Sequence, residues 1–418
     1  MKREDLLSKI SDPSKVWDVV VIGGGATGLG VAVDAVTRGY SVALFEWEDF
    51  AKATSSRNTK LVHGGFRYLA QGDVSLVLEA LYERGLLQQN APHLVKNQSF
   101  LIPNYRYWDN FLYTVGLTIY DILAGRLSLG RSKYVSKKKT TSYLPTVRVD
   151  GLKGGVVYHD GQFDDSRLAV NLAQSCVENG GCPINRMKVT AILHGSDGRA
   201  RGVKVQDLMN GQEYEVKAKA VINATGIFVD SIMEMDVPTH EHMVKPSQGV
   251  HLVLDKSFLQ SDYAIMIPKT DDGRVLFAVP WHDKVVVGTT DTLREHPELE
   301  PQALESEIEF ILNTAGRYLT RKPQRSDVLS VFAGLRPLAA PKKEGKSTKE
   351  ISRSHKIFVS ENKLITITGG KWTTYRRMAE DTVDKAIELN LLEKKACVTK
   401  KFRIHGYQLN PDLNNHLY

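Results

Sequence analysis

The hydrophobic pattern at the start of the chain predicts a buried strand, a helix and a second buried strand. The apolar run at 17–25, WDVVVIGGG, leads into a glycine turn, and 27–39 has the periodicity of a helix that ends at Gly39. Another short apolar run follows at 41–46. Strand, helix and strand in this order are typical of a parallel, doubly wound sheet.

The pattern changes twice later in the chain. Short apolar segments alternate over 244–325, which predicts an antiparallel sheet, whereas 364–389 again has the pattern of strand, glycine turn and helix. We therefore predict an α/β fold with a discontinuous Rossmann-like domain, 16–240 plus 355–390. An antiparallel-sheet substrate domain at 241–354 is inserted between its two parts, an arrangement that commonly forms a cleft.

Composition and charge narrow the class of protein. The chain has 418 residues, 42% of them hydrophobic and 25% charged, which is typical of a globular protein with more than one domain. Its net charge of +7 favours anionic partners such as phosphorylated metabolites or anionic lipid. The basic residues are spread along the chain without a nucleic-acid-binding motif, so nucleic acid is not an expected partner.

Cysteine and histidine patterns argue against a disulfide framework and against a metal site. Cys176, Cys182 and Cys397 show no C-x-x-C spacing, and His240 and His242 lack a third ligand at a suitable spacing. The N-terminus has no apolar signal core, and no apolar run reaches about 18 residues. We therefore expect a cytoplasmic protein without a metal.

The glycine turn has the chemistry of a dinucleotide-binding site. Gly23, Gly25 and Gly28 form the pattern G-x-G-x-x-G between the first strand and its helix, and Glu46 ends the second strand. Glycines let the backbone approach a pyrophosphate, and the helix N-terminus supplies partial positive charge. A carboxylate at Glu46 can accept hydrogen bonds from ribose hydroxyls.

Two later glycine turns favour FAD over NAD as the cofactor. Ala224 and Gly226 follow a buried strand in the segment NATG, and Gly369 and Gly370 precede the last predicted helix. The N-terminal dipole of that helix can stabilise negative charge on a reduced flavin. Contacts from the beginning, middle and end of one chain suit a long, buried cofactor.

Several segments together resemble one family. Over about residues 16–390 the chain is similar to the FAD-dependent glycerol-3-phosphate dehydrogenases, within the wider group of D-amino-acid and glycine oxidases. Members of the family continue into a C-terminal helical domain, so we expect 391–418 to be the start of a truncated C-terminal region. The similar segments are TSSRNTKLVHGGFRYL (54–69), GQFDDSRL (161–168), NATGIFVD (223–230), VGTTDT (287–292), AGLRPL (333–338) and GGKWTTYRRMAE (369–380).

The resemblance implies a reaction and a set of cofactor contacts. The reaction is oxidation of sn-glycerol 3-phosphate to dihydroxyacetone phosphate, with hydride transfer to flavin N5 and electrons passed on to a membrane quinone. Two alternatives stay open: an amine or amino-acid oxidase that uses oxygen, and a catalytically silent flavoprotein relative. Beyond the glycine turn and Glu46, the expected cofactor contacts are Ser55, Ser56, Lys60, Leu61, Ala224, Gly226, Gly370, Thr373 and Thr374, and the two threonines are also expected to cap the last helix.

Charged and polar side chains in these segments suit a phosphorylated substrate. Guanidinium groups bind phosphate in a bidentate manner and keep their charge, and the resemblance points to Arg336 and Arg67, with Arg353 as a third candidate. Tyr68 and Lys371 complete the expected substrate site.

Two histidines compete for the role of the catalytic base, because histidine titrates near the working pH. His251, in SQGVHLVL, is the preferred base, with His63 lining the flavin or the substrate. The opposite assignment is nearly as well supported. Lys371 is expected to stabilise the anionic reduced flavin at its N1–O2 edge.

The stretch 107–125 is amphipathic and precedes a basic segment. Its apolar side chains share one helical face, which suits a helix at the interface of an anionic membrane; the alternative is a core helix packed against the substrate domain. We therefore expect a peripheral position on the inner face of the cytoplasmic membrane, with a homodimer as the candidate oligomer. The residues are Trp108, Phe111, Leu112, Val115 and Ile119 on the face, and Arg126, Arg131, Lys133 and Lys137 to Lys139 after it.

Overall fold

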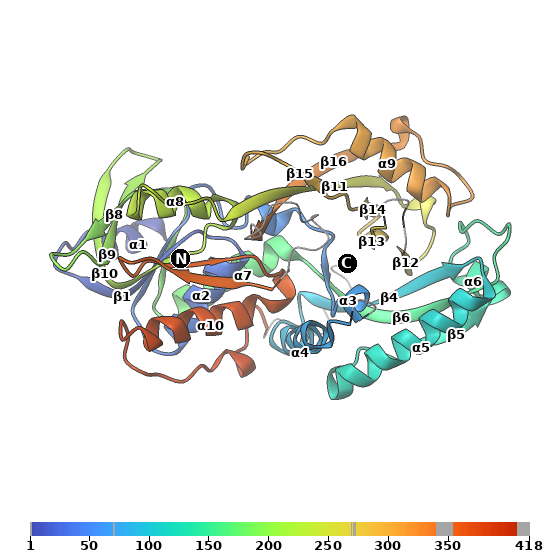
Figure 1. Cartoon of the computed structure of the whole chain (residues 1–418), viewed down its shortest axis with the longest axis horizontal. Coiled ribbons are helices and arrows are strands. Elements are labelled where there is room, and N and C mark those ends of the chain that lie inside the picture. Colours follow the sequence, from blue (N-terminus) through green and yellow to red (C-terminus); the bar gives the residue numbers. More distant parts are fainter. Residues whose placement is uncertain (1, 70–71, 269, 271–272, 340–353, 408–418) are drawn as a thin grey trace.

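Two β-sheets and the helices packed on them make up the described part of the chain, one sheet on the left of Figure 1 and the other on the right. The computed structural model describes residues 2–407 except 70–71, 269, 271–272 and 340–353. The helices are α1 (Arg3–Ile10), α2 (Ala26–Thr37), α3 (Phe66–Leu69), α4 (Val74–Asn90), α5 (Tyr107–Ala124), α6 (Lys137–Tyr143), α7 (Asp165–Glu178), α8 (Val229–Asp236), α9 (Glu305–Gly316) and α10 (Tyr375–Glu388).

The first sheet is mainly parallel and follows the order β17-β18-β10-β1-β2-β7. Strand β1 pairs in parallel with β2 and β10, as expected when helices connect neighbouring strands. The predicted α/β fold with a Rossmann-like sheet is therefore confirmed. The strands are β1 (Val16–Ile22), β2 (Val42–Phe45), β7 (Cys182–Ile184), β8 (Met187–His194), β9 (Ala200–Asp207), β10 (Glu213–Asn223), β17 (Lys356–Val359) and β18 (Ile365–Thr368).

Helix α2 packs against the first sheet and against α10. Leu29 of α2 shares a hydrophobic core with Val19 of β1 and Val383 of α10. Gly30 permits the close approach of the helices, since a Cβ there would lie 2.9 Å from Cδ2 of Tyr375. The beginning and the end of the chain thus form one layer, which fixes the glycine turn between β1 and α2.

The described part of the expected C-terminal region also belongs to this layer. Leu391, Leu392 and Ile404 are buried in the same core as α2 and α10. Residues 391–407 therefore pack on the first domain, and 408–418 lie outside the described residues.

The second sheet has ten strands in a mixed arrangement, with the order β15-β11-β14-β13-β12-β4-β6-β3 and with β16 and β5 paired to β11 and β6. All its pairs are antiparallel except β12 with β4. The strands are β3 (Leu61–Val62), β4 (Val95–Asn104), β5 (Lys133–Ser136), β6 (Gly154–Phe163), β11 (Val244–Asp255), β12 (Ala264–Ile267), β13 (Leu276–Trp281), β14 (Lys284–Gly288), β15 (Thr292–Leu293) and β16 (Ser330–Ala339).

The second sheet does not begin where the sequence placed the domain boundary. Strands β3, β4, β5 and β6 lie inside the range 16–240 that was assigned to the cofactor domain, yet they pair with each other and with β12. The reason is that strand pairing is made by contacts far apart in sequence, which a local pattern does not encode. The boundary at 240 separates β10 from β11 but does not separate the two sheets.

Helix α5 lies on the outside of the second sheet. Its inner residues Leu117 and Tyr120 are buried with Phe100 of β4 and Val156 of β6. Among the described residues no helix combines the length and the hydropathy needed to cross a membrane.

Candidate active site

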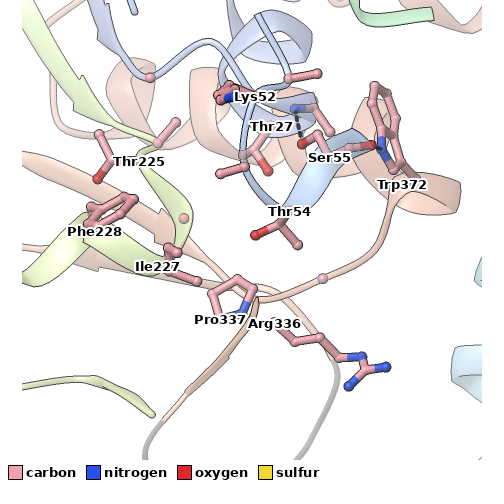
Figure 2. Close-up of a pocket in the computed structure, with 18 of the residues that line it drawn as sticks. Thr27, Lys52, Thr54, Ser55, Thr225, Ile227, Phe228, Arg336, Pro337 and Trp372 are labelled. Carbon is pink, nitrogen blue, oxygen red and sulfur yellow. Dashed lines mark hydrogen bonds between the residues drawn. The ribbon is translucent and has the colours of Figure 1, made fainter. Parts of the chain in front are cut away.

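Two adjoining cavities lie where the sheets meet, with volumes of about 570 Å³ and about 230 Å³. The larger begins at the glycine turn and the smaller extends into the second sheet. Four of the predicted site residues line both cavities and so mark their junction: Leu61, His63, Tyr68 and Arg336. Figure 2 shows part of the larger cavity, with Ser55, Thr225 and Trp372 coming from distant parts of the chain.

The glycine turn shapes one end of the larger cavity. Gly23 has φ +105°, and a Cβ there would lie 2.8 Å from the carbonyl oxygen of Ala224. Gly25 lies at the N-terminal end of α2 and faces the cavity together with Gly23. At Gly23 and Gly25 no side chain of the residue itself covers the backbone next to the helix N-terminus, as binding of a pyrophosphate requires.

Gly28 has a different role from the predicted one. It lines neither cavity within the described residues, and a Cβ there would lie 1.9 Å from the carbonyl oxygen of Gly23. Gly28 therefore allows the tight turn to form and does not itself face the cofactor space.

Glu46 lies at the end of β2 and lines the larger cavity. Its carboxylate accepts hydrogen bonds from the N–H of Gly24 at 2.6 Å and from the N–H of Glu48 at 2.8 Å. Burial raises the pKa of Glu46, and these two N–H groups oppose that rise. The carboxylate is thus held rigidly at the position expected for a ribose contact.

Ser55, in the segment before β3, forms hydrogen bonds to two distant parts of the chain. Ser55 Oγ accepts from the N–H of Ala26 at 2.9 Å, and the carbonyl oxygen of Ser55 accepts from Trp372 Nε1 at 2.7 Å (Figure 2). Ser55 and Leu61 both line the larger cavity, as predicted. Ser56 lines neither cavity among the described residues.

Lys60 forms a partly buried ion pair and does not line either described cavity. Its Nζ lies 2.7 Å from both carboxylate oxygens of Asp165 and donates to the carbonyl oxygen of Ser56 at 2.7 Å. Burial raises the pKa of Asp165, while the Lys60 ammonium lowers it. The predicted cofactor contact of Lys60 is therefore replaced by a structural one that joins this segment to α7.

The turns that follow β10 and β18 form another part of the wall of the larger cavity. Ala224, Gly226, Gly370 and Thr373 line it, in agreement with the positions predicted for cofactor contacts. Thr374 is 4% exposed and lines neither cavity within the described chain.

The two threonines do not cap the last helix as predicted. Helix α10 begins at Tyr375 without a side-chain cap. Thr373 Oγ1 accepts from the N–H of His63 at 3.2 Å, and Thr374 Oγ1 donates to the carbonyl oxygen of Lys371 at 3.3 Å. Thr373 thus connects the end of the chain to the loop that carries His63.

His251 is enclosed on the side of the smaller cavity. It is 2% exposed, its Nε2 lies 2.9 Å from Thr59 Oγ1, and its ring stacks on Phe332 with centroids 4.9 Å apart. Burial, followed by the positive charges of Arg336 and Lys60, lowers the pKa of His251 to about 3. His251 is therefore neutral at ordinary pH and a weak base.

Of the cationic side chains predicted for the substrate, Arg336 lines both cavities, Arg67 the smaller one and Lys371 the larger one. Arg336 donates to Thr289 Oγ1 at 2.9 Å and its guanidinium lies 3.7 Å from Asp291 Oδ1. Arg67, on α3, lines the smaller cavity, and Lys371 Nζ lies 4.1 Å from the ring centroid of Tyr68. Figure 2 shows Arg336 extending beyond Pro337, away from Phe228. Arg353 lies outside the described residues.

The prediction missed several residues that line the smaller cavity, among them Thr59, Tyr158, Asp160 and Arg274. Thr59 lies in the segment 54–69 and Arg274 follows the turn at Gly273, but the sequence pattern indicated no separate role for either side chain. Asp160 and Tyr158 belong to β6, whose place in the second sheet was not predicted.

Comparison with known proteins agrees with this geometry. A family model described as DAO, FAD dependent oxidoreductase, matches residues 18–376. The solved structure titled as the glycerol-3-phosphate dehydrogenase from Bacillus halodurans complexed with FAD has a TM-score of 0.79 and 33% identity. That similarity covers 99% of this chain and 73% of the other.

Curated relatives are also similar over nearly the whole chain. The mitochondrial glycerol-3-phosphate dehydrogenase of Schizosaccharomyces pombe is 43% identical over 97% of this chain. The mitochondrial glycerol-3-phosphate dehydrogenase of Arabidopsis thaliana is 44% identical over 95% of it. The chain spans 66% and 64% of the length of these two relatives.

Proposed function

The chain belongs to the FAD-dependent oxidoreductase family, where it groups with the glycerol-3-phosphate dehydrogenases and has FAD as its cofactor, and we propose that it oxidises sn-glycerol 3-phosphate to dihydroxyacetone phosphate. The observation that carries this proposal is that Arg336 and His63 line both cavities, with Arg67 on the smaller cavity and Lys371 on the larger one. Bound FAD supplies the two-electron acceptor for this oxidation. A quinone is the proposed final electron acceptor.

The larger cavity suits FAD because its polar groups match the parts of a dinucleotide. The bare backbone of Gly23 and Gly25 and the N-terminus of α2 would hold the pyrophosphate. Glu46 would accept from a ribose, and Gly370 with Lys371 would lie beside the ring system. The junction between the cavities would then place a substrate next to the reacting part of the cofactor.

The phosphate of the substrate would bind to cations from three separate segments. Arg67 comes from α3, Arg336 from β16 and Lys371 from the turn before α10. Guanidinium groups recognise phosphate in a bidentate manner, and the Lys371 ammonium adds a point charge. An amino-acid substrate needs one cation for its carboxylate, so this number of cations favours a doubly charged group.

The environment of the two histidines favours His63 as the base that accepts the substrate hydroxyl proton. His63 lines both cavities, whereas His251 lines only the smaller one and its low pKa makes it a poor proton acceptor. The N–H of His63 is held by Thr373, which fixes the main chain of this loop. This assignment reverses the preference drawn from the sequence, and neither has been tested.

The outer face of α5 is the proposed contact with an anionic lipid surface. Trp108 is 68% exposed, Phe111 59% and Ile122 71%, although the opposite face of the helix is buried. Exposed cations follow at Arg126, Arg131, Lys133 and Lys137 to Lys139. Aromatic side chains beside cations are typical of helices that lie in the plane of an anionic membrane surface.

Such a contact would place the enzyme near a membrane quinone. The compartment predicted from the sequence is the cytoplasm, and the homodimer is the predicted oligomer; both remain predictions. Cell fractionation and light scattering of the purified chain test them separately.

An anaerobic titration tests the proposed reaction. We expect addition of sn-glycerol 3-phosphate to the yellow protein to bleach the visible flavin band in proportion to the protein, and we expect no bleaching with glycerol or glycine. The phosphate explains the difference, because glycerol offers the same carbinol without the charged group. Bleaching by glycine together with peroxide release in air would instead identify an amino-acid oxidase.

A further inference from the structure

A buried polar network joins helix α5 to the loop that carries His63. The N–H of Gly64 donates to Tyr120 Oη at 2.8 Å, and Tyr120 Oη donates to Asp160 Oδ2 at 2.8 Å. The other oxygen of Asp160 accepts from Arg84 Nη1 at 2.7 Å. The network thus connects α4, α5 and β6 to a single main-chain amide beside His63 (Figure 1).

The members of this network are excluded from water. Arg84 and Tyr120 are each 1% exposed and Asp160 is 3% exposed. Burial raises the pKa of Tyr120 well above its usual range, so the phenol keeps the proton that it donates. Burial also raises the pKa of Asp160, while the Arg84 guanidinium lowers it. The N–H of Gly64 can only donate and the Asp160 carboxylate accepts, so the phenol accepts from the first and donates to the second.

The space around Gly64 shows how closely the loop is held. A Cβ on Gly64 would lie 2.5 Å from Tyr120 Oη and 2.4 Å from Cδ2 of Leu81. Two positions later, the ring of Phe66 meets the ring of Tyr120 edge to face, with centroids 6.0 Å apart. Tyr120 therefore contacts both the amide that follows His63 and the first residue of α3, the helix that carries Arg67.

Tyr120 lines neither described cavity, although Asp160 lines the smaller one. We propose that Tyr120 is a positioning residue, whose hydroxyl fixes the main chain at Gly64 and thereby the placement of His63 and of Arg67 on α3. The hydroxyl acts through the loop and does not touch the substrate. The expected effect of this hydroxyl on the rate of flavin reduction rests on the proposed function, whereas its expected effect on the conformation of the loop does not.

The matched test compares Tyr120→Phe with Tyr113→Phe in the FAD-loaded protein. Both residues lie on α5 and both rings contact Phe66, but no hydrogen bond of the Tyr113 hydroxyl is found among the described residues. Amide hydrogen exchange of a peptide covering 61–69 is the first measurement. We expect exchange at Gly64 to become about tenfold faster or more in Tyr120→Phe, because the N–H loses the Tyr120 oxygen at 2.8 Å and keeps only its interaction with the Asp160 carboxylate, and to stay unchanged in Tyr113→Phe.

Flavin reduction by sn-glycerol 3-phosphate under anaerobic conditions is the second measurement. Well below the thermal midpoints of both variants, we expect Tyr120→Phe to reduce its flavin about 10-fold to 100-fold more slowly than Tyr113→Phe, with the same FAD content. A purely structural role would lower the thermal midpoint and leave this rate unchanged.

Equal exchange at Gly64 in the two variants would overturn the proposal. If Tyr120→Phe yields no folded flavoprotein, amide exchange is measured at Gly64 of the unaltered protein. Exchange as slow as in the buried turns of α5 supports the proposal. Exchange at the rate of an open loop overturns it. If glycerol 3-phosphate fails to bleach the unaltered protein while the exchange difference persists, the proposed function fails and the positioning role stands.

Discussion

At the residue scale, the two histidines near the junction lie in different environments. His251 is buried between Phe332 and Thr59 with a pKa lowered to about 3, whereas His63 lines both cavities. A base works best with a pKa near the operating pH. The environment of His251 therefore suits a neutral wall of the smaller cavity.

Substitution of His63 tests this assignment. We expect His63→Gln to slow flavin reduction at saturating substrate by about 100-fold or more, because general-base catalysis contributes that much. His251→Gln is the control, and we expect a smaller loss of rate. Stopped-flow absorbance measures both, and a larger loss in His251→Gln would return the base role to that residue.

The lowered pKa of His251 also predicts a pH dependence of stability. The folded pKa is about 3 and the reference value is 6.5, so between these values the unfolded chain binds the extra proton. The free energy of unfolding therefore has the full contribution of this group above pH 6.5 and loses it as the pH falls toward 3, by about 1.4 kcal/mol per pH unit.

Thermal or urea unfolding of His251→Gln checks this prediction. It is measured between pH 4 and pH 6, a range of about two units between the two pKa values. We expect the variant to lose less stability on acidification than the unaltered protein. Parallel curves for the two proteins would show that His251 is not neutral in the folded state.

How far single residues could be predicted depended on whether their roles are local. Gly23, Gly25 and Glu46 were found from one short motif because the turn, the helix and the strand end are adjacent in sequence. Lys60 was misassigned because its partner Asp165 lies 105 positions away and is reached only in the folded chain. The cap predicted for Thr373 failed for the same reason, since its hydroxyl instead contacts His63.

At the scale of elements, helix α5 has two faces with different surroundings. Its inner face is buried against α3 and the second sheet, and its outer face presents Trp108, Phe111 and Ile122 to solvent. The buried inner face agrees with the interpretation as a core helix, whereas contact of the exposed outer face with a membrane stays a prediction.

Vesicle binding tests the outer face. We expect Trp108→Ser combined with Phe111→Ser to lower binding to anionic vesicles at least about tenfold, since each apolar side chain contributes about 1.5–3 kcal/mol when it leaves water. Flavin reduction by soluble substrate is expected to stay unchanged. Co-sedimentation with vesicles is the measurement.

Met209→Ser is the matched control, because Met209 is 69% exposed in a turn of the first sheet, far along the chain from α5. We expect it to bind vesicles like the unaltered protein. An equal loss in both variants, or no loss in either, would remove α5 as the lipid contact.

The elements themselves were predicted better than their partners. The order of strand, helix and strand at the start of the chain, and of strand and helix near its end, identified the parallel sheet, because its strands form continuous, buried apolar runs. The place of β4 and β6 beside β12 could not be predicted, since their pairing with distant strands leaves no local signal.

At the scale of the whole molecule, the larger cavity is built from the beginning, the middle and the end of the chain. Ser55, for example, is hydrogen-bonded both to α2 and to the turn before α10. A cofactor in this cavity would contact both sheets, so its binding energy adds to the stability of the folded chain.

Removal of FAD tests this coupling. We expect the apoprotein to unfold at a lower temperature than the FAD-loaded protein, and we expect added FAD to restore the midpoint. At a free FAD concentration about 1,000 times the dissociation constant, the gain in unfolding free energy is about 4 kcal/mol. Calorimetry of the two forms measures it, and identical midpoints would contradict a cofactor site shared by the two sheets.

The meeting of distant cations around one phosphate beside the flavin is the central claim, and a double-mutant cycle tests it most directly. Arg67→Gln, Arg336→Gln and the double variant are reduced anaerobically with sn-glycerol 3-phosphate, and the dissociation constant is taken from the dependence of the rate on substrate. We expect each single variant to stay yellow and to raise this constant by about tenfold or more. The double variant is expected to lose less than the product of the two, because both side chains bind the same group. An unchanged constant in either single variant, or the loss of FAD, would contradict the account.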